Sequence, residues 1–172
     1  MAVAAVDSYM HWMVCSRLSH VRREDSLPAA LAKHPVPFSE LAELAEAVVA
    51  ERRGAGRKIR PWVQVKASLQ DQLLKETFQS YEQISNAFAL AGIKKGWSGV
   101  SDLIGIPSDE IKVGLGYVVH RRNQIVHEGD IERASRPRRL RHNEINHDEV
   151  SSCVDWLEEL VAAIEEVVKA QS

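Results

Sequence analysis

The sequence predicts an all-α protein, a single domain over residues 1–172 built as a bundle of about five or six helices. Apolar residues recur at three- and four-residue spacing in several segments. No segment between turns alternates apolar and polar residues as a half-buried strand does. Glycine and proline divide the chain into pieces of helical length. With 45% apolar and 27% charged residues, the composition is that of a globular chain.

Two helices are expected before the first glycine-rich turn. The first covers residues 3–22, where valines, methionines and a leucine form one apolar stripe. Three prolines then interrupt the chain, at Pro28, Pro35 and Pro37. A second helix is expected to begin at Ser39, a favoured N-cap residue, and to end before Gly54.

The middle of the chain predicts two further helices and a short one. Pro61 suits the first turn of a third helix. A fourth is expected over residues 80–91, ending at Gly92. Residues 93–107 are expected to form turns around one short helix.

Two long helices are expected to complete the chain. Ser108 is predicted to cap a helix that runs through His127, and Gly129 to end it. Asn146 followed by Glu149 resembles a capping box that opens the final helix.

Cysteine content and hydropathy predict a cytoplasmic protein. Cys15 and Cys153 are too few for a disulfide framework, which favours a reducing compartment. No apolar run approaches the roughly 18 residues of a membrane helix. The first residues carry no positively charged leader, so neither a signal peptide nor a membrane partner is expected.

Charge is distributed unevenly along the chain. The formal net charge of −2 excludes capture of nucleic acid by overall charge. Residues 132–141 nevertheless hold five arginines against one acid, namely Arg133, Arg136, Arg138, Arg139 and Arg141. This loop is a candidate lining for an RNA path. Because it lacks aromatic residues to stack on bases, a solvated loop without a ligand is the alternative.

The helix that ends near His127 carries the candidate site. On an ideal helix, Gly116, His120, Asn123 and His127 form one polar strip. The opposite arc is expected to face the core and contains Ile111, Leu115, Val118, Val119, Ile125 and Val126. Arg122 falls in the middle of this apolar arc. Its guanidinium must therefore reach out of the arc, pair with a carboxylate, or face a cleft for an anion.

The residues around this helix also resemble a known family. The string RRNQIVHEGD is similar to the signature of the HEPN superfamily, an arginine followed after four to six residues by a histidine. Arg122 and His127 match it with four intervening residues, and the polar Asn123 follows the arginine. Together with DSYMHW in the first helix, the string resembles the RiboL-PSP-type HEPN proteins. The resemblance covers most of the chain in the order and length of its helices, but only residues 116–131 match the family residue by residue.

The resemblance implies a metal-independent endoribonuclease with no cofactor, acting on RNA as a homodimer. Two copies of the helix from Gly116 to His127 would face each other, with Gly114 and Gly116 allowing close approach. His127 would act as base or acid, with its copy in the complementary role. Arg122 would hold the phosphate, and Asn123 would orient the imidazole or bind the phosphate.

Other residues would help to bind the substrate in such an enzyme. Arg121 would be a second phosphate contact, or the matching arginine under a looser spacing, and His120 would contact the substrate. A role in toxin–antitoxin systems or phage defence is implied. Some HEPN toxins carry a tyrosine two residues after the histidine, which an antitoxin modifies. Gly129 stands there in this chain, so a possible antitoxin would have to act by binding.

The residue types suit the chemistry of RNA cleavage through the 2′-hydroxyl. Histidine titrates near neutral pH and can act as a general base or acid. The phosphorane carries more negative charge than the phosphate, and a permanently charged guanidinium suits that charge. DNA lacks the 2′-hydroxyl and would not be cleaved.

Alternatives remain open for the same residues. A histidine near a helix C-terminus is favoured by the macrodipole alone, and the domain could be an inactive interaction or nucleotide-binding module. A helical DNA-binding regulator is disfavoured because no helix-turn-helix pair is recognisable. A metal site is not expected, because the histidines and Cys153 contain no closely spaced pair of the kind that binds zinc. Asp7, one turn before His11, is the candidate counter-ion for Arg121 or Arg122, or else part of an exposed pair.

Overall fold

A computed structural model describes residues 2–20, 27–54, 60–131 and 142–171. These residues form an all-α structure without a strand, which confirms the predicted fold class. They contain eight helices rather than the five or six expected, and the four-residue α2 has no counterpart in the prediction. The helices are α1 (Ala2–His20), α2 (Ala29–Ala32), α3 (Phe38–Arg52), α4 (Pro61–Leu73), α5 (Tyr81–Ala91), α6 (Gly96–Ile104), α7 (Ser108–Glu128) and α8 (His147–Ala170).

Several predicted helix ends are confirmed. Pro61 occupies the first turn of α4, where its missing N–H costs no helical hydrogen bond. Ser80 caps α5 in a capping box with Gln83. Gly129 ends α7 with a φ of 65°, a left-handed conformation that glycine adopts without steric penalty. The local chemistry of these residues therefore determines where these helices begin or end.

The predicted serine caps are wrong. Helix α3 begins one residue before Ser39, and its N-cap is Pro37. Helix α7 begins at Ser108 itself, and its N-cap is Pro107. The carbonyl of each proline accepts the first helical N–H groups, so the serine already lies in the first turn. The Ser108 hydroxyl instead donates to the backbone carbonyl of Trp97, at 3.5 Å.

The N-cap of α8 is confirmed at Asn146, but the expected capping box with Glu149 is not formed. Its side-chain oxygen accepts a hydrogen bond from the backbone N–H of Asp148, at 2.9 Å. The first turns of α8 do not face the core, and Val150 there is 50% exposed. The buried residues of α8 are Leu157, Leu160, Ala163, Ile164 and Val167. Only the C-terminal two thirds of α8 therefore pack into the bundle.

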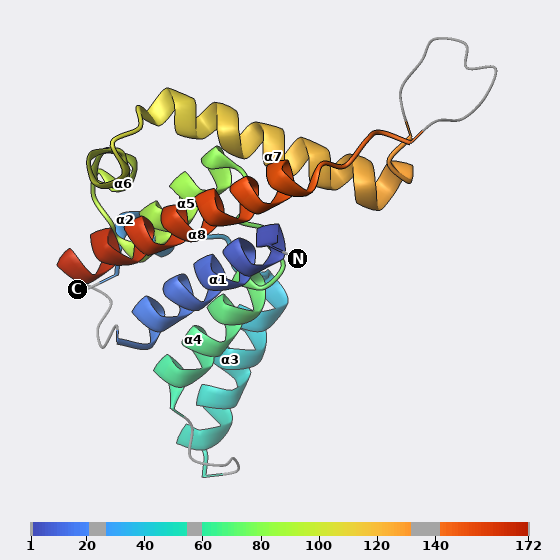
Figure 1. Cartoon of the computed structure of the whole chain (residues 1–172). Helices are drawn as coiled ribbons and strands as arrows, with labels where there is room; N and C mark the ends of the chain where they lie inside the picture. The colour runs from blue at the N-terminus through green and yellow to red at the C-terminus, as the bar shows by residue number, and fades with distance from the viewer. Residues whose placement is uncertain (1, 21–26, 55–59, 132–141, 172) are drawn as a thin grey trace.

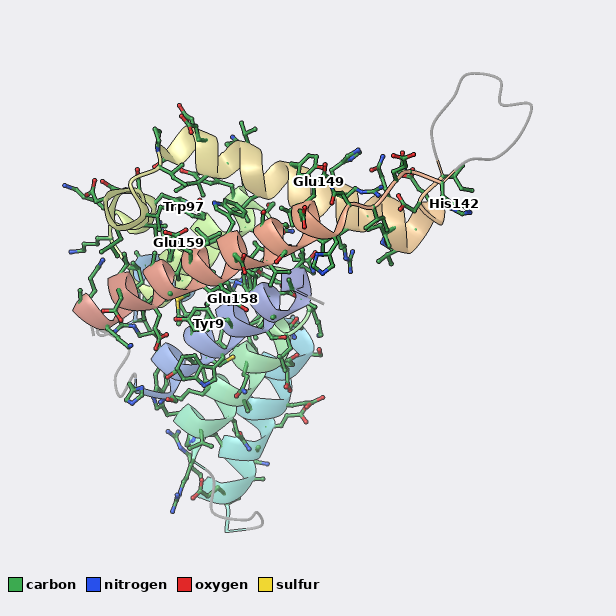
Figure 2. All side chains as sticks on the ribbon, viewed as in Figure 1. Tyr9, Trp97, His142, Glu149, Glu158 and Glu159 are labelled. Carbon is green, nitrogen blue, oxygen red and sulfur yellow. The ribbon has the colours of Figure 1, made fainter. Side chains whose placement is uncertain are left out.

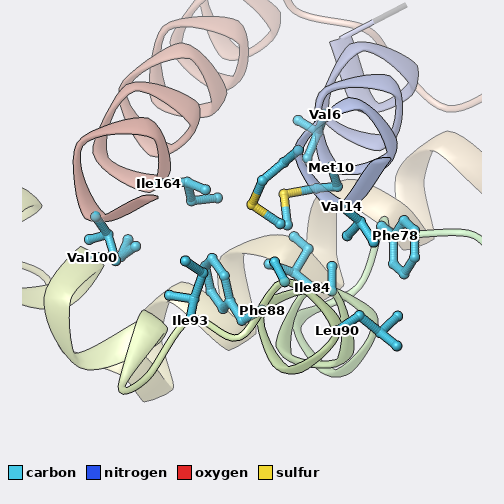
Figure 3. Packing of buried hydrophobic residues seen from close by; sticks show 14 of the residues in the cluster. Val6, Met10, Val14, Phe78, Ile84, Phe88, Leu90, Ile93, Val100 and Ile164 are labelled. Atoms are coloured by element: carbon cyan, nitrogen blue, oxygen red, sulfur yellow. The ribbon is translucent and has the colours of Figure 1, made fainter. Parts of the chain in front are cut away.

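Helix α1 lies at the centre of the core and packs against α4, α5, α7 and α8 (Figure 1). Its predicted stripe is confirmed, since Val3, Val6, Met10, Met13, Val14 and Leu18 are all buried. Figure 3 shows Met10 lying between Ile164 of α8 and Ile84 and Phe88 of α5. This shared core positions α7 and α8, which carry the candidate site.

None of the helices in the described residues combines the length and the apolar content needed to cross a bilayer.

Candidate functional site

The polar strip of α7 is open to solvent along its length. His120 and His127 are exposed, and Asn123 is half-buried. Gly116 is also exposed, and a Cβ built on it would meet no heavy atom within 4 Å. The expectation that Gly114 admits a second copy is wrong, because a Cβ there would lie 3.0 Å from the Trp156 ring of α8. Gly114 thus allows Trp156 of α8 to pack closely against α7, whereas the surface above Gly116 is unoccupied by any described residue.

The apolar arc of α7 is buried over only half of its length. Ile111, Leu115 and Val118 face the core as predicted. The prediction is wrong for Ile125 and Val126, which are 46% and 57% exposed. Figure 1 shows the reason, since the last turns of α7 lie to the side of the bundle, beside the segment that leads into α8. The arc around Arg122 is therefore a surface and not the interior of the protein.

This surface is the wall of an open groove of about 390 Å³. The groove lies between the C-terminal half of α7, the start of α8 and the first turn of α1. Its lining is mostly apolar and includes the exposed side chains of Tyr117, Ile125, Val126, Ile145 and Val150. Arg121 and Arg122 also line it. Figure 2 shows Glu149, another lining residue, on α8 where that helix approaches α7.

Two of the three alternatives expected for Arg122 apply, since it reaches out of the apolar arc and also lines the groove. Its side chain is half-buried, and its Nη1 donates to the side-chain oxygen of Asn123 at 2.8 Å. That bond draws the guanidinium from the apolar arc toward the polar strip. The same residue faces the groove. A guanidinium has five N–H donors, so one bond to Asn123 leaves capacity to bind an anion.

Arg121 has a structural partner. Its guanidinium forms a two-pronged ion pair with the carboxylate of Asp130, in which Nη2 lies 2.9 Å from Oδ2. Asp7 is not the counter-ion of either arginine, contrary to the prediction. Its carboxylate accepts hydrogen bonds from the backbone of Phe78 and the side chain of Gln79, and lies 3.9 Å from His11 Nε2.

Asp130 is a site residue that the sequence analysis did not predict. It is buried, with a φ of 58° that aspartate tolerates better than most residues. Its carboxylate also accepts a hydrogen bond from the Asn143 side chain at 2.9 Å, and its carbonyl accepts the Asn143 backbone N–H. Asp130 therefore ties the end of α7 to the segment before α8. The Gly-Asp pair after a helix was its only local signal.

The remaining predicted substrate contacts lie outside the described residues: Arg133, Arg136, Arg138 and Arg139. The described residues on either side of them meet at the end of α7. Ile131 and His142 form an isolated antiparallel bridge, and His142 Nδ1 lies 2.9 Å from the carbonyl oxygen of Gly129. Figure 2 shows His142 beside this end of the helix. Ile131 and His142, the described residues that flank this segment, therefore meet at the C-terminal end of α7, the helix that carries His127.

The hydrogen bonds to Asp130 predict a specific acid sensitivity. The Asn143 side chain, followed by the Arg121 guanidinium, lowers the pKa of the Asp130 carboxyl below its ordinary value, against the opposing effect of burial. A lowered pKa means that this stabilisation is present above the unfolded pKa of about 3.9 and is lost as pH falls through the folded value. We expect Asp130→Asn to lower the melting temperature at pH 7, and the difference from wild type to shrink toward pH 3.

Melting followed by circular dichroism from pH 7 to pH 3 measures this difference. The exposed carboxyl of Asp102 on α6 provides the control, since Asp102→Asn should change the melting temperature little at any pH. A difference between Asp130→Asn and wild type that stays constant with pH would contradict the role of the ionised carboxylate.

Comparison of the chain with models of protein families, with curated proteins and with solved structures finds no match.

Proposed function

We propose that the protein is a metal-independent endoribonuclease of the HEPN type. One observation carries the proposal: the Arg122 guanidinium is bonded to Asn123, which lies one helical turn before the exposed His127. A permanent cation, an amide and an imidazole therefore lie on the C-terminal half of a single helix, and the amide and the imidazole share its exposed strip. These three groups suit the binding of a phosphodiester and the transfer of its protons.

The spacing of the two charged groups favours a site shared between two copies. Five positions along a helix place Arg122 and His127 about 140° apart around its axis. One copy does not aim both side chains at the same phosphate unless Arg122 bends round, as its bond to Asn123 begins to do. A twofold arrangement of the helix from Gly116 to His127 would bring two arginines and two histidines into one cleft. The proposed enzyme is therefore a homodimer.

The exposed apolar side chains of α7 support this dimer. Tyr117, Ile125 and Val126 stand on the surface of the helix, and Gly116 leaves room for a close approach. Large apolar side chains grouped on a surface are typical of protein interfaces. Burying them against a second copy would also remove water from the proposed cleft, which strengthens the electrostatic action of Arg122.

In the proposed reaction, a histidine removes the proton of the RNA 2′-hydroxyl, and its oxygen attacks the adjacent phosphorus. The bond to the 5′-oxygen breaks, and the second histidine of the dimer protonates that leaving oxygen. Arg122 stabilises the charge of the phosphorane. The products are a 2′,3′-cyclic phosphate end and a 5′-hydroxyl end. No cofactor and no metal ion takes part in these steps.

Arg121 has a changed role in this proposal. Its pairing with Asp130 makes it a residue that positions the end of α7, and Arg122 is left as the arginine of the motif. We place the activity in the cytoplasm, in a toxin–antitoxin or phage-defence system. An antitoxin would restrain it by binding, since Gly129 offers no side chain to modify.

Incubation of the purified protein with a mixed RNA substrate in EDTA tests the proposal. We expect cleavage that persists in EDTA, fragments that end in 2′,3′-cyclic phosphate, and no cleavage of DNA of the same sequence. Identification of the fragment ends by mass spectrometry provides the measurement. Intact RNA after incubation with a folded dimer, across substrates of varied sequence, would contradict the assignment.

The second candidate function is a HEPN-like module that binds a protein or a nucleotide without catalysis. The apolar groove of about 390 Å³ favours it, because the volume and lining suit a bound segment or small molecule. The two candidates differ in the role of His127. Catalysis requires its imidazole, whereas the groove residues do not include it.

A further inference from the structure

The hairpin of α3 and α4 has an uncovered apolar side. Figure 1 shows the two helices side by side, projecting from α1 away from α7. Helix α3 contains 15 residues, and none of them is buried. Its contacts are with α4, which in turn packs on α1. A helix of this length in a finished domain normally buries one face, so α3 presents a face that nothing in the described structure covers.

The uncovered side forms a groove of about 550 Å³ between the two helices. Its apolar lining comes from Leu41, Leu44 and Ala47 of α3 and from Val65 of α4. Leu41 is 49% exposed, and the other three side chains are half-buried. The spacing 41, 44 and 47 gives a continuous stripe along one helix, which is the geometry that accepts side chains from a second helix.

The charged residues of this groove all have the same sign. Glu40, Glu43 and Asp71 line it, and no lysine or arginine is among the residues that do. The nearest cation on α4, Lys66, is directed elsewhere, since its Nζ donates to the carbonyl of Ser19 at 2.9 Å. A partner in this groove would therefore meet a negative potential beside an apolar stripe.

Two polar atoms in the groove also lack a partner in the described residues. Glu40 accepts a hydrogen bond from Gln72 through Oε1, at 2.7 Å, but its buried Oε2 has no donor. The buried hydroxyl of Ser68 likewise has no hydrogen bond. Buried polar groups are normally satisfied. Because Oε2 is itself buried, an ammonium or guanidinium group in the groove would pair with the Glu40 carboxylate after a rotation of this side chain.

We propose that this groove binds an amphipathic helix of a protein partner, with lysine or arginine on either side of its apolar stripe. Its apolar side chains would fill the space over Leu41, Leu44 and Ala47, and a basic side chain would pair with Glu40. A second copy of the hairpin is disfavoured as the occupant, because it would bring the carboxylates of the two grooves together. This surface is separate from the groove beside Arg122 and does not depend on nuclease activity.

A fluorescein-labelled peptide tests the proposal with the full-length protein. The peptide carries leucines at three- and four-residue spacing with lysines beside them, and its control has glutamate at each lysine position. Fluorescence polarisation should show saturable binding of the lysine peptide and at least tenfold weaker binding of the glutamate peptide. No saturable binding of the lysine peptide would overturn the proposal, as would equal binding of both.

Two substitutions on α4 locate the binding. Ala67 lines the groove and Val63 lies outside it, and both are exposed. Arginine at either place adds the same charge to the same helix and buries nothing new. Ala67→Arg should weaken binding of the lysine peptide at least tenfold, and Val63→Arg should change it less than twofold. Equal effects of the two variants would overturn the proposal.

Two further measurements address Glu40 and the alternative occupant. Glu40→Gln should weaken binding severalfold, because the amide keeps the bond with Gln72 but loses the charge. Unchanged affinity in this variant would contradict the pairing. Sedimentation of wild type and Ala67→Arg should give the same oligomeric state. Loss of an oligomer in Ala67→Arg would show that a second copy occupies the groove and would overturn the proposal.

Discussion

Replacement of His127 by alanine is expected to lower the rate of RNA cleavage by about 10² to 10⁴-fold, the usual contribution of a positioned general acid or base. The imidazole is exposed in the last turn of α7, so its removal leaves no cavity in the core. The helix should fold as before, and the loss should appear in the chemical step. Single-turnover cleavage of a labelled RNA, with the protein in excess and EDTA present, measures this rate directly.

The matched control is another exposed histidine. His147, whose side chain is 94% exposed at the start of α8, has no part in the proposed chemistry. His147→Ala should cleave RNA at the wild-type rate. Arg122→Ala should be as slow as His127→Ala, and Arg122→Lys should recover only part of the rate, because an ammonium lacks the planar fork of the guanidinium.

The outcomes separate the two candidate functions. If His127→Ala cleaves as fast as wild type, the histidine is not catalytic, and its place at a helix C-terminus is explained by the macrodipole. If both proteins are inactive but bind RNA or a partner equally well, the interaction module is favoured.

The second large effect is expected in the core that holds α7 in place. Leu115 is 1% exposed on the buried side of this helix. Leu115→Ala removes apolar contacts and leaves a cavity, which should lower the free energy of unfolding by about 2–5 kcal/mol. Val113, two residues earlier, is 72% exposed, so Val113→Ala should change stability by no more than about 0.5 kcal/mol.

Urea denaturation followed by circular dichroism measures both values. The midpoint of unfolding should fall for Leu115→Ala at an unchanged slope. A comparable loss of stability in Val113→Ala would contradict the assignment of Leu115 to the buried side and Val113 to the exposed side of α7.

Local sequence chemistry was sufficient to predict most helices and several of their ends. The stripe of α1, the helix that begins after Ser80 and the glycine that ends α7 were each predicted from a few neighbouring residues. The two serine caps failed because the non-helical N-cap conformation falls on Pro37 and Pro107, which places both serines inside the first turn. Both serines are favourable caps by propensity, and a neighbouring residue decided the boundary.

The candidate site was only partly predictable. Helical spacing placed Asn123 and His127 on one strip of a helix, and the resemblance to HEPN proteins pointed to Arg122, Asn123 and His127 as candidate residues. Spacing did not show that Arg121 pairs with Asp130, because that contact depends on how the chain turns after Gly129. It also failed to show that Ile125 and Val126 are exposed, because periodicity reports which residues share a face and not whether another element covers it.

The all-α class and the order of the helices follow from the sequence by itself, since backbone hydrogen bonds within a helix join residues four positions apart and depend on local residue types. Only the tertiary structure decided three other features: the place of the candidate site on an open helix end, the counter-ion of Arg121, and the uncovered sides of α3 and α7. Burial and ion pairing depend on residues far apart in the chain, and those residues meet only when the core around α1 has formed.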